Sequence, residues 1–233
     1  MPDQRGSRQN TVFPSGGREA HGYLARPPQG LGPGLVLVQE WWGLTPYLAG
    51  VADRFAAEGF TVLAPDLFGG DTTHDRAEAA RLERELPVEQ AVQDLRGAVG
   101  HLLGLEGVVG DAVGVVGFCM GGGFALLLAA AEGDRVAAAV PFYGLPPDRE
   151  FEYRGLTAHV LGHFAEHDRS VPMKAVDEAA IRIGEATDVR PEIHFYPAGH
   201  AFMNEEDLLG TYDPLQARTA WLRTVSFLWG HLG

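Results

Sequence analysis

Hydrophobic positions along the chain recur with two periods, which predict an alternation of strands and helices. Short apolar runs rich in β-branched residues are typical of buried strands, and they occupy residues 34–39, 60–64, 112–116, 136–142, 158–164 and 192–196. Apolar side chains at helical spacing follow helix-start signals at Thr45-Pro46, Pro87, Met120, Pro172 and Asp213-Pro214. Weak alternation over residues 11–26, interrupted by Gly16 and Gly17, predicts a hairpin at a sheet edge.

This order of elements predicts an α/β fold. Strands that alternate with helices at this pitch are joined by right-handed crossovers, so the central sheet should be mostly parallel with helices on both faces. A length of 233 residues suits one domain over residues 1–233, with residues 1–10 as a flexible polar tail.

Charge and cysteine content narrow the range of partners. The chain carries 18 basic and 31 acidic residues, a net charge of −13, which repels nucleic acid and anionic lipid. With a single cysteine and no apolar secretory segment in the first ten residues, we expect a cytoplasmic monomer. Residues 107–131 are apolar enough to resemble a membrane span, but seven glycines and the lack of flanking anchors favour a buried strand and helix.

The strongest chemical signal is the pentapeptide Gly117-Phe118-Cys119-Met120-Gly121, at the predicted strand-to-helix junction. Its spacing is that of a nucleophile elbow with cysteine in place of serine, and the glycines leave room where strand and helix backbones nearly touch. The helix N-terminus would favour the thiolate of Cys119, and the amide of Met120 would be an oxyanion donor. The alternative is a small buried apolar cysteine.

An acid and a histidine follow the cysteine in the order this elbow requires. Asp168 lies after the predicted strand at 158–164, and His200 lies after the strand at 192–196. His200 would transfer the thiol proton, and Asp168 would hold its ring in the required tautomer.

Metal and nucleotide sites are not predicted. His159, His163 and His167 stand four apart, but in a strand residues four apart are separated by roughly 13 Å, too far to share one ion. The glycines at 121–123 lack the Gly-Lys-Ser/Thr sequence of a phosphate-binding loop. We expect neither a metal nor a cofactor.

From about residue 30 to the C-terminus the chain resembles the dienelactone hydrolase (carboxymethylenebutenolidase) family of α/β-hydrolases. The motifs that carry the resemblance are VQEWWGL at 38–44, APDLFGG at 64–70, GFCMGG at 117–122, PFYG at 141–144, HDRSVP at 167–172 and GHAF at 199–202. The resemblance implies a Cys119, His200 and Asp168 triad, a thioester intermediate and a small ester or lactone substrate. It also implies that Glu40 takes part in activating the cysteine and that the amide of Trp41 is a second oxyanion donor.

The resemblance is less complete where substrate is bound. Dienelactone-cleaving members resemble one another in an arginine four residues after the histidine, and this chain has Asn204 there. A second family arginine would be matched by Arg81 or Arg76, for which a solvated helix face is the alternative. An apolar or aromatic acyl group is expected from the aromatic residues of the motifs, which are Trp42, Phe118, Tyr143 and Phe202.

Two other functions stay open from the sequence. A reactive cysteine would also suit a redox-sensing thiol protein, although no second cysteine is present to resolve an oxidised sulfur. A catalytically silent binding module on the same fold is the other, because fold alone does not establish activity.

Overall fold

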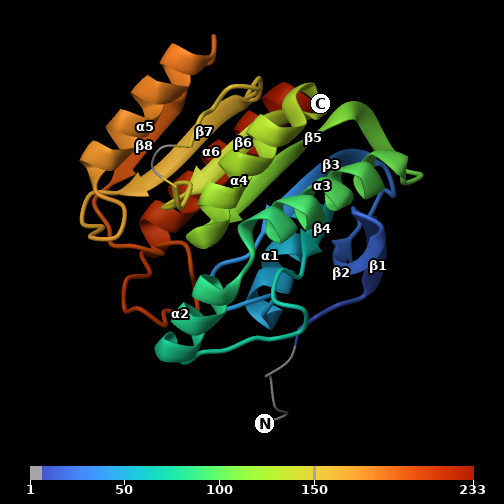
Figure 1. The fold of residues 1–233 in the computed structure, drawn as a ribbon, viewed down its shortest axis with the longest axis horizontal. Helices are drawn as coiled ribbons and strands as arrows, with labels where there is room; N and C mark the ends of the chain where they lie inside the picture. The colour runs from blue at the N-terminus through green and yellow to red at the C-terminus, as the bar shows by residue number, and fades with distance from the viewer. Residues whose placement is uncertain (1–6, 149–150) are drawn as a thin grey trace. The chain divides into compact units, whose positions relative to one another are not determined.

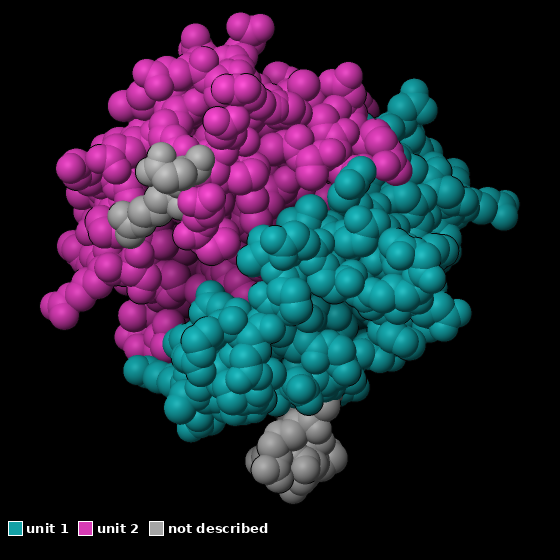
Figure 2. Space-filling view, in the orientation of Figure 1, with its two compact units in different colours: residues 1–113 teal, residues 114–233 magenta. Residues whose placement is uncertain are grey.

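A computed structural model describes residues 7–148 and 151–233 of the chain. The described chain forms two compact units, Met1–Val113 and Gly114–Gly233, coloured separately in Figure 2. The predicted single domain over residues 1–233 stays a prediction. Residues 1–6 of the expected tail lie outside the described residues, whereas Ser7 and Gln9 both donate hydrogen bonds to Asp66.

Four strands of the eight-stranded sheet lie in the first unit, in the order β1-β2-β4-β3. They are β1 (Thr11–Ser15), β2 (Arg18–Ala25), β3 (Gly32–Val38) and β4 (Thr61–Pro65). The hairpin β1–β2 is confirmed, and its turn residues Gly16 and Gly17 have φ of 54° and 85°, where a side chain is disfavoured. β2 pairs antiparallel with β4, and β3 pairs parallel with β4.

The helices of the first unit are α1 (Pro46–Ala57), α2 (Arg76–Glu85) and α3 (Val88–Gly104). The predicted start at Thr45-Pro46 is confirmed, because the Thr45 side chain accepts a hydrogen bond from the Leu48 amide and Pro46 occupies the first turn. α3 packs against β1, β3 and β4, and α1 packs against β2 and β4.

The strands of the second unit follow the order β5-β6-β7-β8. They are β5 (Val108–Phe118), which begins before the boundary between the units, β6 (Val136–Phe142), β7 (His159–Ala165) and β8 (Glu192–Tyr196). β6, β7 and β8 are parallel, as predicted. β5 is longer than the predicted 112–116, because its first residues are largely exposed and carry no buried apolar pattern.

Helices cover both faces of the strands of the second unit, as predicted. They are α4 (Met120–Glu132), followed by a 3₁₀ turn at Gly133–Arg135, then α5 (Met173–Ala186) and α6 (Pro214–Leu232). Leu126 of α4 and Val176 of α5 face the same small space as Val160 and Phe164 of β7. His163 points to the other face, where Thr224 of α6 contacts it. Figure 1 shows α4 in front of these strands and α6 behind them.

His163 is a fully buried polar residue in this unit. Its Nδ1 lies 2.8 Å from the Tyr196 hydroxyl and its Nε2 lies 3.0 Å from the Thr224 hydroxyl. Burial lowers the pKa of His163 well below its ordinary value of 6.5, and the nearby His194 and Arg223 lower it further. The ring is therefore neutral in the folded protein.

No helix within the described residues has the length and apolar character needed to cross a bilayer.

The buried His163 predicts a loss of stability at acid pH. Its pKa is lower in the folded chain than in the unfolded chain, so the unfolded state binds more protons as pH falls below about 6.5. Between pH 7.5 and pH 5.5 this one group should remove about 1.4 kcal/mol of unfolding free energy. Urea unfolding at the two pH values should show that His163→Gln loses less stability than wild type by about that amount.

The matched control is His21→Gln, because His21 is exposed. This variant should keep the wild-type difference between the two pH values. An equal pH dependence in wild type and His163→Gln would show that His163 is not buried in neutral form.

Candidate active site

Cys119 occupies the sharp turn between β5 and α4. It is the N-cap residue of α4, with φ of 53° and ψ of −120°, and it is partly exposed. Such a conformation is rare for a residue with a side chain and is typical of a strained nucleophile elbow. The amide of Met120 is the first N–H of α4 and therefore has no acceptor within the helix.

Close backbone approaches enforce this turn. A side-chain carbon added to Gly117 would lie 1.9 Å from the carbonyl oxygen of Gly121, and one added to Gly144 would lie 1.8 Å from the carbonyl oxygen of Cys119. The Cys119 amide donates to the carbonyl of Phe142 at 3.0 Å. Glycine is thus required on both sides of the cysteine, within its own motif and in the loop after β6.

Three side chains of the second unit make a continuous line of contacts. Nε2 of His200 lies 3.1 Å from Sγ of Cys119, and Nδ1 of His200 lies 2.6 Å from Oδ2 of Asp168. The structure therefore brings together the three residues that the sequence singled out, from loops after β5, β7 and β8.

Backbone groups that the sequence analysis did not identify hold this line in place. The other carboxylate oxygen of Asp168 accepts hydrogen bonds from the amides of Ser170 at 2.7 Å and Val171 at 3.1 Å. The Thr211 hydroxyl donates to the carbonyl of His200. An aspartate followed two residues later by serine is a signal for such a turn, and it could have been read from the sequence.

The environment of His200 favours its protonated form. Burial by itself lowers the pKa of His200, but hydrogen bonds to Asp168 and Cys119, together with their charges, outweigh it and raise the pKa to about 10. Because Asp168 has a side chain with no exposed surface, its carboxylate acts on the imidazole with little screening. The geometry suits a thiolate–imidazolium pair.

Backbone strain gathers around the same residues. Besides Cys119, left-handed φ values among non-glycine residues occur at Tyr143 (37°), which follows β6, at Ala201 (62°), directly after His200, and farther along the same loop at Asp207 (50°). Residues in these sparsely populated regions persist only where the surroundings fix them, and they cluster at functional sites.

The predicted aromatic residues of this unit pack beneath the triad. Phe118, Tyr143 and Phe202 are 3%, 0% and 0% exposed. The Tyr143 ring meets the His200 ring edge-on, with centroids 5.2 Å apart, and meets the Phe202 ring at 5.5 Å. They form the apolar floor under His200 and present almost no surface to a ligand.

Glu40, Trp41 and Trp42 belong to the first unit. Glu40 comes two residues after β3 and is 4% exposed, so its carboxylate is buried. The rings of Trp41 and Trp42 lie 5.0 Å apart, with Trp42 3% exposed. Burial of an acidic residue at a strand end is unusual unless it has partners or a function.

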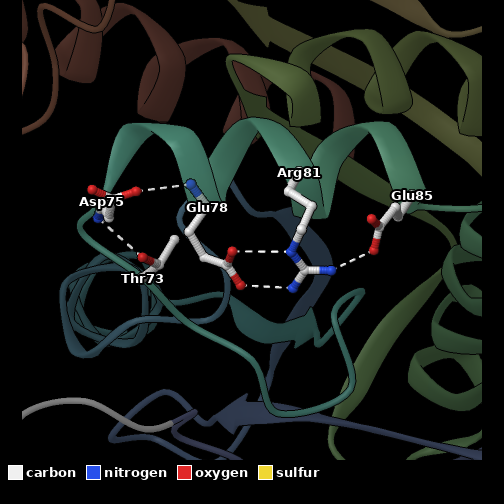
Figure 3. A network of polar contacts seen from close by, with 5 residues as sticks. All are labelled: Thr73, Asp75, Glu78, Arg81 and Glu85. Carbon is white, nitrogen blue, oxygen red and sulfur yellow. Dashed lines mark hydrogen bonds and ion pairs between the residues drawn. The ribbon is translucent and has the colours of Figure 1, made fainter.

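Arg81 lies in a network of ion pairs on α2 (Figure 3). Its Nη2 pairs with Glu78 at 2.6 Å, its Nε also donates to Glu78, and its Nη1 pairs with Glu85. The hydrogen bond to Glu78 raises the pKa of Arg81 and lowers the pKa of Glu78. The side chain is 41% exposed. Arg81 therefore already has two carboxylate partners, and Arg76 begins the same helix.

Asn204 serves the loop after His200. Its side-chain oxygen accepts from the Glu206 amide at 2.9 Å, and the residue is 3% exposed. This is the role of a turn-forming asparagine rather than that of a cationic ligand-binding residue.

Neither a metal-binding cluster nor the cavity described below adds a residue to the group of Cys119, His200 and Asp168. Among the described residues, no group of three or more His, Cys, Asp or Glu side chains is placed to hold a metal ion. A cavity of about 560 Å³ lies between the loop at 145–148 and α5, and Cys119 and His200 are not among its lining residues.

Comparison with known proteins agrees with the geometry. A model of the dienelactone hydrolase family matches residues 20–232. The chain belongs to the dienelactone hydrolase family. It is 31% identical to the carboxymethylenebutenolidase of Pseudomonas sp. (strain P51), over 94% of this chain and 93% of that protein. It is 32% identical to protein usf of Aquifex pyrophilus, over 94% of this chain and 96% of that protein.

Solved structures place the fold in the same family. A Klebsiella pneumoniae protein provisionally named a dienelactone hydrolase has a TM-score of 0.83 and 28% identity, covering 94% of this chain and 96% of that one. The α/β-hydrolase fold expected from the sequence is therefore confirmed, and the family assignment supports an ester or lactone hydrolase.

The close approach at the elbow predicts a severe effect of one added methyl group. Gly117→Ala should lower the unfolding free energy by roughly 3 kcal/mol or prevent folding, because the new carbon meets backbone that cannot move aside. Gly230→Ala in α6 is the matched control, since nothing lies within 4 Å of the added carbon. It should be neutral or stabilising by up to about 1 kcal/mol in urea unfolding. A Gly117→Ala variant as stable as wild type would contradict the described turn.

Proposed function

We propose that this protein hydrolyses a small ester or lactone through a Cys119–His200–Asp168 triad and a thioester intermediate. The observation that carries the proposal is the line of contacts from sulfur to imidazole at 3.1 Å and from imidazole to carboxylate at 2.6 Å. Its support from outside this geometry is the match to the dienelactone hydrolase family.

In the acylation step, the Cys119 thiolate attacks the substrate carbonyl carbon and forms a carbon–sulfur bond. The carbonyl electron pair moves to oxygen, and the resulting oxyanion accepts hydrogen bonds from backbone amides. When the oxyanion collapses, the carbon–oxygen bond to the alcohol breaks. His200, protonated at Nε2, gives its proton to the departing alkoxide, while Asp168 holds Nδ1–H and keeps the ring aligned.

In the deacylation step, neutral His200 takes a proton from water. The hydroxide attacks the thioester carbon, the carbon–sulfur bond breaks, and the acid product leaves. Cys119 returns as the thiolate beside protonated His200, so protons and electrons balance over the cycle.

The amide of Met120 is our proposed oxyanion donor, because it begins α4 next to the sulfur. We assign the amide of Trp41 as the second donor and Glu40 to cysteine activation, both on the family resemblance. Trp42 is a sequence-based candidate for substrate contact, but it is 3% exposed, as buried as Phe118, which supports a packing role for its side chain. For Phe118, Tyr143 and Phe202, complete or nearly complete burial supports a packing role beneath the triad.

The proposed substrate class is a small carboxylic ester or lactone, and the buried aromatic residues give no support to an apolar acyl group. Of the positions that the family resemblance points to for holding a substrate carboxylate, Arg81 is already paired with Glu78 and Glu85, and Asn204 forms a turn. We therefore propose that a substrate carboxylate is not required. The family assignment does not favour a redox sensor or a silent binding module. A cytoplasmic monomer remains part of the proposal.

The mechanism predicts acylation of one residue. Mixing the protein with an activated short-chain ester such as 4-nitrophenyl acetate should add the mass of one acetyl group to Cys119, seen by intact-mass and peptide mass spectrometry. Cys119→Ala should lose the adduct and at least about 10³-fold in kcat/KM, because no other group can replace the nucleophile. Full esterase activity in Cys119→Ala would exclude this mechanism.

The raised pKa of His200 predicts the alkaline side of the pH profile. His200 must carry a proton for the leaving alcohol, so kcat/KM should stay high up to about pH 10 and fall as the imidazolium loses its proton. Asp168→Asn removes the carboxylate that raises this pKa, so the fall should move to lower pH and kcat should drop. Identical alkaline limbs in wild type and Asp168→Asn would show that the carboxylate does not act on His200.

A further inference from the structure

A chain of polar side chains lies on the α6 face of the sheet, below the ends of β7 and β8. Arg223 Nη1 lies 2.9 Å from the Tyr196 hydroxyl, which lies 2.8 Å from His163 Nδ1. His163 Nε2 lies 3.0 Å from the hydroxyl of Thr224. His163, Tyr196 and Thr224 are at most 2% exposed, so water does not compete for these bonds.

The donors and acceptors in this row of polar side chains can be assigned in one consistent way. Thr224 donates its single hydroxyl hydrogen to the carbonyl of Ala220 at 2.9 Å, so it accepts from His163 Nε2–H. His163 Nδ1 is then an acceptor, and Tyr196 donates to it. Arg223, which can only donate, gives a hydrogen bond to the Tyr196 hydroxyl oxygen. Each member has one role, so no member can shift without breaking a bond to its neighbour.

This row of polar side chains joins β7 and β8, the two strands that precede the loops of Asp168 and His200. β7 and β8 pair in parallel with Ala165 opposite Tyr196. Beyond the strands the two segments stay joined, because the Glu166 amide donates to the carbonyl of Tyr196 and the His167 amide donates to the carbonyl of Ala198. Asp168 follows directly on one segment and His200 on the other. The distance between these two side chains therefore depends on how β7 and β8 end.

Aromatic packing makes a second connection from the polar chain to the triad. The Tyr196 ring lies 5.0 Å from the Phe202 ring, which contacts Tyr143, the residue whose ring meets His200 edge-on. The His163 carbonyl also accepts from the Tyr143 amide at 2.8 Å.

Buried polar side chains are not needed to stabilise a protein core. Apolar residues of the same volume are often as stable, whereas a satisfied polar network fixes one arrangement. We infer that His163 and Tyr196 are positioning residues, which hold the loops of Asp168 and His200 at the spacing that the triad needs. This inference rests on the proposed function, because the residues that are positioned are those of the proposed triad. Its test measures the reactivity of the cysteine and does not require substrate hydrolysis.

Titratable groups face His163 from two neighbouring elements, β8 and α6. They are Tyr196 and His194 from β8, with the His194 ring 6.0 Å away, and Arg223 from α6, while β6 presents the apolar ring of Phe142. Burial, His194 and Arg223 all lower the pKa of His163, and no carboxylate acts on it to raise the pKa. His163 therefore stays neutral and does not titrate alongside the triad, and Arg223 is the charged member of the network.

The test is the pH dependence of Cys119 alkylation by iodoacetamide. The thiolate displaces iodide and forms a carbon–sulfur bond, and the chain has one cysteine, so the rate reports Cys119 alone. In the curve of alkylation rate against pH, the rise on the acid side, here called the acid limb, gives the pH at which the thiolate forms. Tyr196→Phe should move this limb upward by at least about 0.5 pH unit, because a looser contact between Asp168 and His200 stabilises the imidazolium less.

A control and a double variant separate positioning from stability. Tyr153→Phe removes a hydroxyl from another buried tyrosine of the same unit and should leave the limb unchanged. The double variant His163→Leu/Tyr196→Phe replaces both partners by apolar side chains and should regain most of the melting temperature lost in Tyr196→Phe, while the limb stays shifted. A limb that returns to wild type together with the melting temperature would show that packing alone suffices. An unshifted limb in Tyr196→Phe would equally overturn the inference.

These outcomes are independent of the proposed function. If Cys119 forms no acyl adduct but the alkylation limb moves in Tyr196→Phe, the hydrolytic mechanism fails and the positioning role stands. If the adduct forms and the limb does not move, the hydrolase stands and the positioning role fails.

Discussion

The site depends on a backbone that passes very close to itself where β5 ends and α4 begins. Gly117 and Gly121 approach within the strand–helix turn, and Gly144 lies against the Cys119 carbonyl from the loop after β6. Only hydrogen fits at Gly117 and Gly144, so the cysteine between them adopts a φ of 53° that its own side chain disfavours. The strain gives a sulfur that is partly exposed at the start of a helix, where a negative charge is stabilised.

Much of this could be predicted from the sequence because the determining contacts are local. The hairpin follows from Gly16 and Gly17, the start of α1 from Thr45 and Pro46, and the elbow from glycines two residues on either side of Cys119. The strand assignment of β7 also followed from its apolar run, and it separates His159 from His163 as a strand does.

Other features depend on contacts between distant parts of the chain and could not be predicted. Neither the fixed tautomer of His163 nor the strained φ of Tyr143 has a signal in a single sequence, since each is set by residues on other strands and helices. The pairing of Arg81 was different. Glutamates three residues before it and four residues after it on one helix are the ordinary pattern of ion pairs, and this pattern favoured the solvated alternative.

Two histidines of the second unit, His163 fully buried and His200 partly buried, show what decides protonation there. Burial lowers the pKa of both, yet His163 stays neutral while the pKa of His200 is raised to about 10. The partners make the difference, because His163 contacts two hydroxyl groups, whereas His200 contacts a carboxylate and a thiol that can ionise. A hydroxyl chain can fix geometry without adding charge, and a carboxylate adds the charge that an imidazolium needs. The same residue type thus supplies a neutral element on β7 and, in the proposed mechanism, a proton carrier in the loop after β8.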